Sequence, residues 1–308
     1  MILRKTPAKV NLFLEVGGVR KDGYHEIFSL VDLICLYDEI EFSFARDWAV
    51  EFHPPTGIDP HNNTVTSAIN IFRQQFPEIS PLHLKVRKGI PAGAGLAGGS
   101  SDGACVLKTL NEIFKCCLSR QQLFHMAEKV GADVPLFIAD RRCLITGKGE
   151  KVKILPETCT LWYVLFLPGQ VVPTGKVYAW YDELNQSGNL TWAKQQVKIL
   201  SKNLAEENVP GTEKLLFNRL QESCELHYSD IKKMRIYLEK KYKRRFVLSG
   251  SGGTLFSVFA DYDSARECAF SFPGRKDWRV IVVSSVDYLA HRRTYGDYGD
   301  KSVGGEQS

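Results

Sequence analysis

The chain has 308 residues and a net charge of +5, and 44% of its residues are hydrophobic against 24% charged. This composition is typical of a soluble globular protein with one large domain or two domains of ordinary size. Lysines and arginines are scattered, which argues against a nucleic-acid-binding face, whereas a mildly basic balance suits a phosphorylated small substrate.

The cysteines and the apolar segments bear on the location of the protein. None of the eight cysteines forms a C-x-x-C pair, and most lie in apolar stretches, such as Cys35 in LICLY and Cys105 in GACVL. We therefore predict buried free thiols in a reducing compartment. The N-terminal segment lacks the apolar core of a signal peptide, and no apolar run approaches the ~18 residues of a membrane span. The prediction is a cytoplasmic protein without a membrane partner; no transit peptide is seen, but a plastid or another organelle stays open.

The first half of the chain mixes strands and helices. Alternating apolar residues predict strands over 8–16, 30–44 and 82–88. Apolar residues at three- and four-residue spacing predict helices over 63–76, 101–114 and 119–130. We expect further short strands in VPLFIA (134–139) and CLITGKGEKVKIL (143–155).

The pattern changes around residues 155–160, which predicts a domain boundary. A buried strand is expected at 161–168, followed by a mainly helical region over 175–238. Three strands then follow in RRFVLSG, TLFSVFA and WRVIVVSSV, with one helix at 262–269. We therefore predict an N-terminal domain over 1–155, a C-terminal α+β domain over 156–290 and a flexible tail over 291–308.

A glycine-rich loop in RKGIPAGAGLAGGSSDGACVLKTL (87–110) contains the string G-x-G-x-x-G at Gly93, Gly95 and Gly98. A dinucleotide-binding unit requires a strand, this turn, a helix and a second strand with an acidic residue. Here a second helix follows the first, so the β-α-β unit fails. The string G-x-x-x-x-G-K-[S/T] of a Walker A loop is absent from the chain.

A third interpretation of this loop needs only backbone physics. Its glycines allow positive φ and a close approach to a ligand, and Ser100, Ser101 and Asp102 are N-cap residue types. The unpaired N–H groups and positive dipole end of the following helix would then face the loop and favour a phosphate group. An ordinary tight connection stays open, although such a turn rarely needs four glycines and two serines.

PAGAGLAGGSSDGA (91–104) resembles the ATP-binding motif of the GHMP kinases, the family of galactose, homoserine, mevalonate and phosphomevalonate kinases. PAKVNLFLEV (7–16) resembles the N-terminal motif of the family, and LSGSGGTLFSVF (248–259) resembles its C-terminal motif. The three motifs occur in the family's order and span the chain to about residue 290. The resemblance implies a two-domain α+β kinase, with an N-terminal α/β domain like domain 2 of ribosomal protein S5 and a ferredoxin-like C-terminal domain.

The resemblance implies ATP as co-substrate, with the glycine loop around its phosphates and an asparagine on the adenine side. Lys88, at the end of the strand before the loop, could also reach the nucleotide. The residues expected to bind ATP are Asn63, Lys88, Pro91, Ala92, Gly93, Ala94, Gly95, Leu96, Ala97, Gly98, Gly99, Ser100 and Ser101.

The resemblance also implies a catalytic pair, Lys9 and Asp133, although each taken alone would be an ordinary strand lysine or turn aspartate. Asp133 would take the proton of the substrate hydroxyl. Lys9 would keep Asp133 ionised and offset charge that grows on the transferred phosphoryl group.

Through KDGYHE (21–26), the resemblance implies a small-molecule substrate that carries a cytidine diphosphate group, with Tyr24 stacked on cytosine and His25 bonded to its edge. Tyr178 would be the second stacking face, and the turn SGSGGT (249–254) would close over the site. The expected substrate-binding residues are Asn11, Tyr24, His25, Thr174, Tyr178, Gly250, Ser251 and Gly252.

The chain departs from the family pattern at Ala97 and Gly103, where glycine and alanine are usual, and at Gly253, where proline is common. Mg²⁺ is expected with ATP, and Ser100 or Ser101 could bind it, but no carboxylate ligand can be assigned. Two alternatives stay open: a sibling kinase that acts on another small alcohol, and a non-catalytic nucleotide-binding relative. The expected assembly is a monomer or a weak homodimer.

Overall fold

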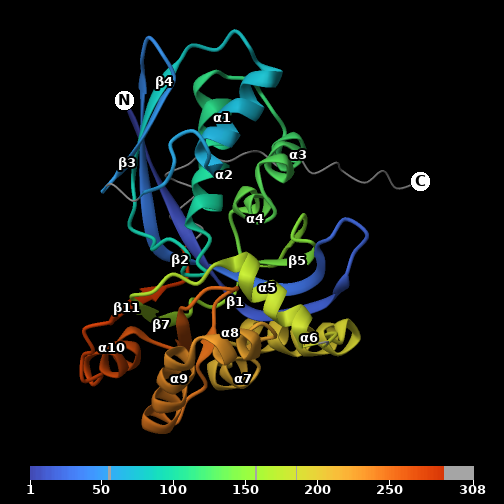
Figure 1. Ribbon diagram of the computed structural model, residues 1–308, viewed down its shortest axis with the longest axis vertical. Helices are drawn as coiled ribbons and strands as arrows, with labels where there is room; N and C mark the ends of the chain where they lie inside the picture. Colours follow the sequence, from blue (N-terminus) through green and yellow to red (C-terminus); the bar gives the residue numbers. More distant parts are fainter. Residues whose placement is uncertain (55–56, 157, 185, 288–308) are drawn as a thin grey trace.

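The computed structural model describes residues 1–54, 57–156, 158–184 and 186–287. Within these ranges, a seven-stranded sheet is built around the long antiparallel pair β1 (Ile2–Val19) and β2 (His25–Phe44) (Figure 1). The start of β2 pairs with β5 and its end pairs with β4, so one strand carries two neighbours along its length. The remaining strands of this sheet are β3 (Ala49–His53), β4 (Leu82–Arg87), β5 (Cys143–Gly147), β6 (Lys151–Ile154) and β8 (Phe217–Asn218).

Helices α1 to α4 pack against this sheet and against one another (Figure 1). The three-and-four spacing of Val65, Ile69 and Phe72 gives α1 an apolar stripe, and all three side chains are buried in this core. The helices are α1 (Thr64–Gln75), α2 (Gly98–Ile113), α3 (Arg120–Val130) and α4 (Val134–Ala139).

A second sheet, antiparallel and ordered β11-β7-β10-β9, forms from the later residues. Its strands are β7 (Trp162–Pro168), β9 (Val247–Leu248), β10 (Leu255–Phe259) and β11 (Trp278–Ser284). The accompanying helices are α5 (Thr174–Glu183), α6 (Leu190–Ala205), α7 (Val209–Lys214), α8 (Gln221–His227), α9 (Ser229–Tyr242) and α10 (Tyr262–Phe270). A second apolar core joins the layers, where Ala8, Val10 and Leu12 of β1 pack with residues of β7 and α6.

Most predicted elements are confirmed, but the strand expected at 134–139 is wrong: these residues form helix α4. All six are buried, so the run has no periodicity that separates a strand from a helix, and Pro135 fits the first turn of a helix. Strand β3 was not predicted. The boundary near residue 155 stays a prediction, because β8 returns from the later part of the chain to pair with β1. The tail expected at 291–308 lies outside the described residues.

The predicted free thiols are confirmed, since all eight cysteines are unpaired and four of them are buried. Burial raises the pKa of the Cys105 thiol to about 11, which keeps it protonated and unreactive at neutral pH. None of the helices in the described ranges has the length and apolar character needed to cross a membrane.

Two glycine loops, one from each half of the chain, pack backbone against backbone. A Cβ atom added at Gly252 would lie 2.0 Å from the nitrogen of Gly95, and one added at Gly95 would lie 2.0 Å from the carbonyl oxygen of Ser249. The Ser249 hydroxyl donates to the Gly95 carbonyl at 3.0 Å. Both positions therefore require glycine for close approach, and Gly95 also requires it for a φ of +78°.

Replacing Gly252 by alanine is expected to destabilise the protein by about 2 kcal/mol or more, because the added methyl group would displace backbone atoms that cannot swing aside. The measurement is urea unfolding of Gly252→Ala beside Gly18→Ala, whose Cβ would have no neighbour within 4 Å. Equal free energies of unfolding for the two variants would show that the loops are not held in this contact.

Candidate active site

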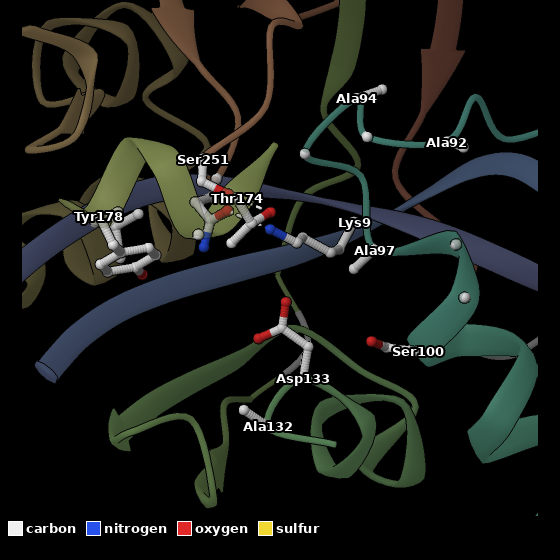
Figure 2. Close-up of a pocket in the computed structure, with 18 of the residues that line it drawn as sticks. Lys9, Ala92, Ala94, Ala97, Ser100, Ala132, Asp133, Thr174, Tyr178 and Ser251 are labelled. Carbon is white, nitrogen blue, oxygen red and sulfur yellow. Dashed lines mark hydrogen bonds between the residues drawn. The ribbon is translucent and has the colours of Figure 1, made fainter. Parts of the chain in front are cut away.

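A cavity of about 800 Å³ opens between the two glycine loops, strand β1, the start of α4 and helix α5. Figure 2 shows Lys9, Asp133, Ser100, Thr174 and Tyr178 around it. These residues come from four separate segments of the chain, so the cavity exists only in the folded protein.

Lys9 and Asp133 approach each other across this cavity without a direct ion pair (Figure 2). Alternation along β1 directs Ala8 and Val10 into the apolar core and leaves Lys9 and Asn11 on the cavity face. The Lys9 ammonium donates to Asn11 Oδ1 at 2.6 Å, and Asn11 donates to the Ser29 hydroxyl at 2.9 Å. Burial lowers the pKa of Lys9, and the nearby charge of Asp133 opposes this shift.

Asp133 occupies the N-cap position of α4, but its side chain makes no capping hydrogen bond. Its carboxylate is therefore available to the cavity, where Lys9 and the Tyr178 ring are its charged and aromatic neighbours. A group that must accept a proton needs this freedom.

The glycine loop leads directly into the first turn of α2, whose unpaired N–H groups lie beside the cavity. Ala97, the residue before the helix, has φ +55° and ψ 33°, a left-handed conformation that glycine adopts at lower cost. The alanine that departs from the family pattern therefore has a strained backbone conformation. Ser100 lines the cavity, whereas Ser101 is buried and its hydroxyl has no hydrogen-bond partner among the described residues.

A buried ionic cluster holds both ends of this loop. The Lys88 ammonium donates to Asp38 and, at 2.7 Å, to Asp102 Oδ2. Asp38 Oδ1 accepts the backbone N–H groups of Gly89 and Ile90, each at 2.7 Å. Burial raises the pKa of the Asp102 carboxyl to about 7; the Lys88 ammonium opposes this shift, and the negative charge of Asp38 adds to it. Lys88 borders the cavity, yet both of these bonds anchor the loop.

The far end of the cavity is aromatic. Tyr24 and Tyr178 line it together with His25, whose ring centroid lies 5.3 Å from that of Tyr178. The Lys148 ammonium lies 4.6 Å from the centroid of the Tyr24 ring, a cation–π contact. His25 Nε2 contacts Asp182 Oδ1 at 2.7 Å.

Most of the residues predicted from sequence line this one cavity, and four do not: Asn63, Leu96, Ser101 and Gly252. Asn63 caps helix α1 by accepting from the Thr66 N–H at 2.9 Å. Leu96 lies in the apolar core, and its carbonyl accepts the Lys9 N–H. Gly252 provides the close loop packing described above. Asn63, Leu96 and Gly252 thus support the site from outside the cavity, and the ligand contacts expected of all four residues stay predictions.

Sequence reasoning missed several cavity residues, among them Thr64, Lys148 and Asp182. The Thr64 hydroxyl donates to the Gly99 carbonyl at 2.5 Å and so ties α1 to the loop. The spacing of Tyr178 and Asp182, four residues apart on one helix, was a usable signal because such residues share a helix face. Lys148 lies between two glycines in a hairpin turn and carries no such pattern.

Comparison with known proteins agrees with this geometry. The model of the protein family described as "GHMP kinases N terminal domain" matches residues 63–141. A 4-diphosphocytidyl-2-C-methyl-D-erythritol kinase of Syntrophotalea carbinolica is 35% identical, over 91% of this chain and 98% of the relative. A crystal structure of a 4-(cytidine 5'-diphospho)-2C-methyl-D-erythritol kinase superposes with a TM-score of 0.76 at 30% identity, over 92% of this chain and 98% of that one. A Streptococcus pneumoniae phosphomevalonate kinase in complex with phosphomevalonate and AMPPNP shares the fold, with a TM-score of 0.67 at 15% identity over 91% of this chain and 100% of that one.

The fold, the glycine loop at a helix N-terminus and the relatives together define a small-molecule kinase of the GHMP class, with the predicted two-domain α+β fold. At this level the predictions of fold and enzyme class are confirmed, and the class implies the use of ATP. The chain belongs to the family of 4-diphosphocytidyl-2-C-methyl-D-erythritol kinases.

The cluster around Lys88 predicts a pH dependence of stability. The Asp102 pKa is raised to about 7 from an ordinary 3.8, so the folded state holds a proton that the unfolded chain releases. The stability that the folded state gains from this proton is complete below pH 3.8 and is lost as the pH rises through about 7. We expect the stability of the wild type, relative to an Asp102→Asn variant, to decrease between about pH 4 and pH 7.

Urea unfolding across this pH range measures the effect, with Asp263→Asn on the exposed first turn of α10 as the matched control. A difference between wild type and Asp102→Asn that is the same at every pH would contradict the shared proton.

Proposed function

We propose that the protein transfers the γ-phosphoryl group of ATP to the 2-hydroxyl of 4-diphosphocytidyl-2-C-methyl-D-erythritol, a step in the non-mevalonate route to isoprenoid precursors. The observation that supports this most is one continuous cavity. It runs from the glycine loop, past Lys9 and Asp133, to the aromatic end at Tyr24, His25 and Tyr178. Such a cavity suits a triphosphate at one end and a flat base at the other.

At the phosphate end, the residues supply position and charge. Backbone N–H groups of the loop and of the first turn of α2 would hold the phosphates, and the helix dipole favours their negative charge. Phosphoryl transfer needs little covalent help from a protein, so in-line placement and charge neutralisation are the main requirements.

At the reacting centre, Asp133 would accept the proton of the acceptor hydroxyl. Lys9 and Asp133 line the same cavity without a direct ion pair, and that hydroxyl and the transferred group would lie between them. Lys9, held by Asn11, would direct its ammonium to the charge that develops on the phosphoryl oxygens. Gly250 permits this placement, because a Cβ atom there would lie 2.9 Å from Lys9 Nζ.

Mg²⁺ is expected to accompany ATP, and the cavity offers it a candidate side-chain oxygen beside the expected position of the ATP phosphates. Mg²⁺ in kinases is held by substrate phosphates, waters and one or two protein oxygens. Ser100 Oγ at the loop can supply one such oxygen. Asp102 is committed to Lys88 and Thr6, and no group of three acidic, histidine or cysteine side chains in the described ranges forms a metal site. When bound, the ion would neutralise phosphate charge.

At the base end, Tyr24 and Tyr178 would stack on cytosine and His25 would bond to its edge. Stacking of this kind contributes roughly 1–3 kcal/mol per contact. A sibling kinase that acts on a small alcohol without a base would have no use for this aromatic end.

A coupled assay of ADP release over a panel of acceptors tests the proposal. We expect turnover with the cytidine diphosphate acceptor and background rates with homoserine, mevalonate and galactose. Turnover with one of the small alcohols would favour a sibling kinase, and background rates with every acceptor would favour a non-catalytic relative.

Replacing Asp133 by asparagine should lower kcat by at least about a hundredfold, because the amide cannot accept the proton. The dissociation constant of a non-hydrolysable ATP analogue should change little, since the phosphates are expected at the loop. Isothermal titration and the ADP-release assay measure the two quantities. The matched control is Asp263→Asn, an exposed carboxylate on α10 outside the cavity. A variant at position 133 with near-normal turnover would show that another group is the base.

A further inference from the structure

His25 and Asp182 form a hydrogen-bonded pair at the aromatic end of the cavity. His25 begins strand β2, and Asp182 lies in the last turn of α5. The separation of His25 Nε2 and Asp182 Oδ1 is 2.7 Å, and both residues border the cavity. The His25 side chain is 8% exposed and that of Asp182 is 49% exposed, so the imidazole is enclosed while the carboxylate reaches solvent.

The chemistry of this pair fixes the position of the ring proton. An ionised carboxylate can only accept a hydrogen bond, so Nε2 of His25 must carry the hydrogen and donate it. In the neutral imidazole, Nδ1 is then a bare lone pair that can only accept. Among the described residues, no side chain or backbone group bonds to Nδ1, so this acceptor is available to a ligand.

Helix α5 also fixes the orientation of the ring. Tyr178 and Asp182 are four residues apart and lie on the same helix face. The Tyr178 ring is 5.3 Å from His25 between centroids, and the Tyr181 ring is 5.8 Å away, edge-on. Two rings and a carboxylate from one helix therefore hold the imidazole in one pose.

We propose that Asp182 is a positioning residue that fixes the His25 tautomer and thereby sets the preference of the site for cytosine over uracil. This inference rests on the proposed function, because it needs a pyrimidine base at the aromatic end. The pairing edge of cytosine has one donor, the exocyclic amino group, and otherwise acceptors. A bare Nδ1 can therefore pair only with that amino group. Uracil has a carbonyl oxygen at the same place, and two lone pairs would oppose each other.

Asp182→Asn is the variant that separates tautomer control from simple support. The asparagine amide can donate to Nε2, which moves the ring hydrogen to Nδ1 and turns the acceptor into a donor. A donor at Nδ1 suits the uracil oxygen and opposes the cytosine amino group. The ratio of kcat/KM for the cytidine diphosphate acceptor to that for its uridine counterpart should fall about tenfold.

Two further variants complete the series. Asp182→Glu keeps a carboxylate and should keep the ratio within about threefold of the wild type. Glu183→Gln removes the neighbouring exposed carboxylate of α5, which does not border the cavity, and should leave the ratio unchanged. Loss of structure would lower both rates together, whereas the inference requires their ratio to change.

Nitrogen-15 NMR of the free enzyme, with His25 assigned by a His25→Gln sample, reads the tautomer without any substrate. We expect Nε2 protonated and Nδ1 bare in the wild type, and a shift toward protonated Nδ1 in Asp182→Asn. An unchanged base ratio in Asp182→Asn, or a wild-type ring protonated on Nδ1, would overturn the inference and leave the proposed function standing. Background turnover of the wild type with the cytidine acceptor would overturn the proposed function, and the inference with it.

Discussion

One buried ammonium, that of Lys88, determines where the glycine loop between β4 and α2 is placed. It is shared between Asp38 on β2 and Asp102 on α2, and Asp102 also accepts from the Thr6 hydroxyl on β1 at 2.7 Å. The cluster therefore joins the two central strands to the start of the helix that follows the glycine loop. Loss of one partner from such a buried set typically costs about 3–5 kcal/mol, since the remaining charges stay out of water. The cluster thus anchors the residues on both sides of the glycine loop, so conformational freedom is confined to the loop itself.

The two faces of strand β1 have different roles: one packs in the apolar core, and the other lines the cavity. Ala8, Val10 and Leu12 join the apolar core between the layers, while Lys9 and Asn11 face the cavity. An ammonium on this strand is accordingly desolvated by the packing that holds the strand in place, which is why burial lowers the pKa of Lys9. Asn11 and Asp133 are the groups that compensate, one by a hydrogen bond and the other by charge.

The sequence predicted what local pattern encodes. Period-two and period-3.6 spacing located most strands and helices, and the glycines with two serines located the loop that lines the cavity and leads into α2. Local pattern failed for Val134–Ala139, where all side chains are buried on every side and periodicity vanishes. Local pattern also did not predict the contacts between segments that are far apart in the sequence. Position 252 requires glycine because it packs against Gly95, and Lys88 anchors the loop because it bonds to Asp38. Both contacts join residues far apart in the sequence, so no short-range pattern predicts them. Asn63 illustrates the converse, because its residue type suits a ligand contact and a helix cap equally well, and the cap is what the fold uses.

Helix α5 connects the two ends of the proposed acceptor site. Thr174 at its first residue accepts from the Ser251 hydroxyl at 2.8 Å, close to Lys9, and Asp182 near its last residue holds His25. A helix of ten residues is about 15 Å long and does not stretch, so these two contacts are kept at a fixed separation. The acceptor proposed here has the same construction, with a base at one end, the reacting hydroxyl at the other and a diphosphate between them. Because phosphoryl transfer depends on the placement of the hydroxyl to within about 1 Å, recognition of the base at one end of a rigid helix aligns the reacting group at the other. In the proposed arrangement, the identity of the base affects the rate of transfer as well as the affinity. The fixed length of α5, which carries Tyr178 and Asp182, sets the distance between the base and the reacting hydroxyl that the site accepts.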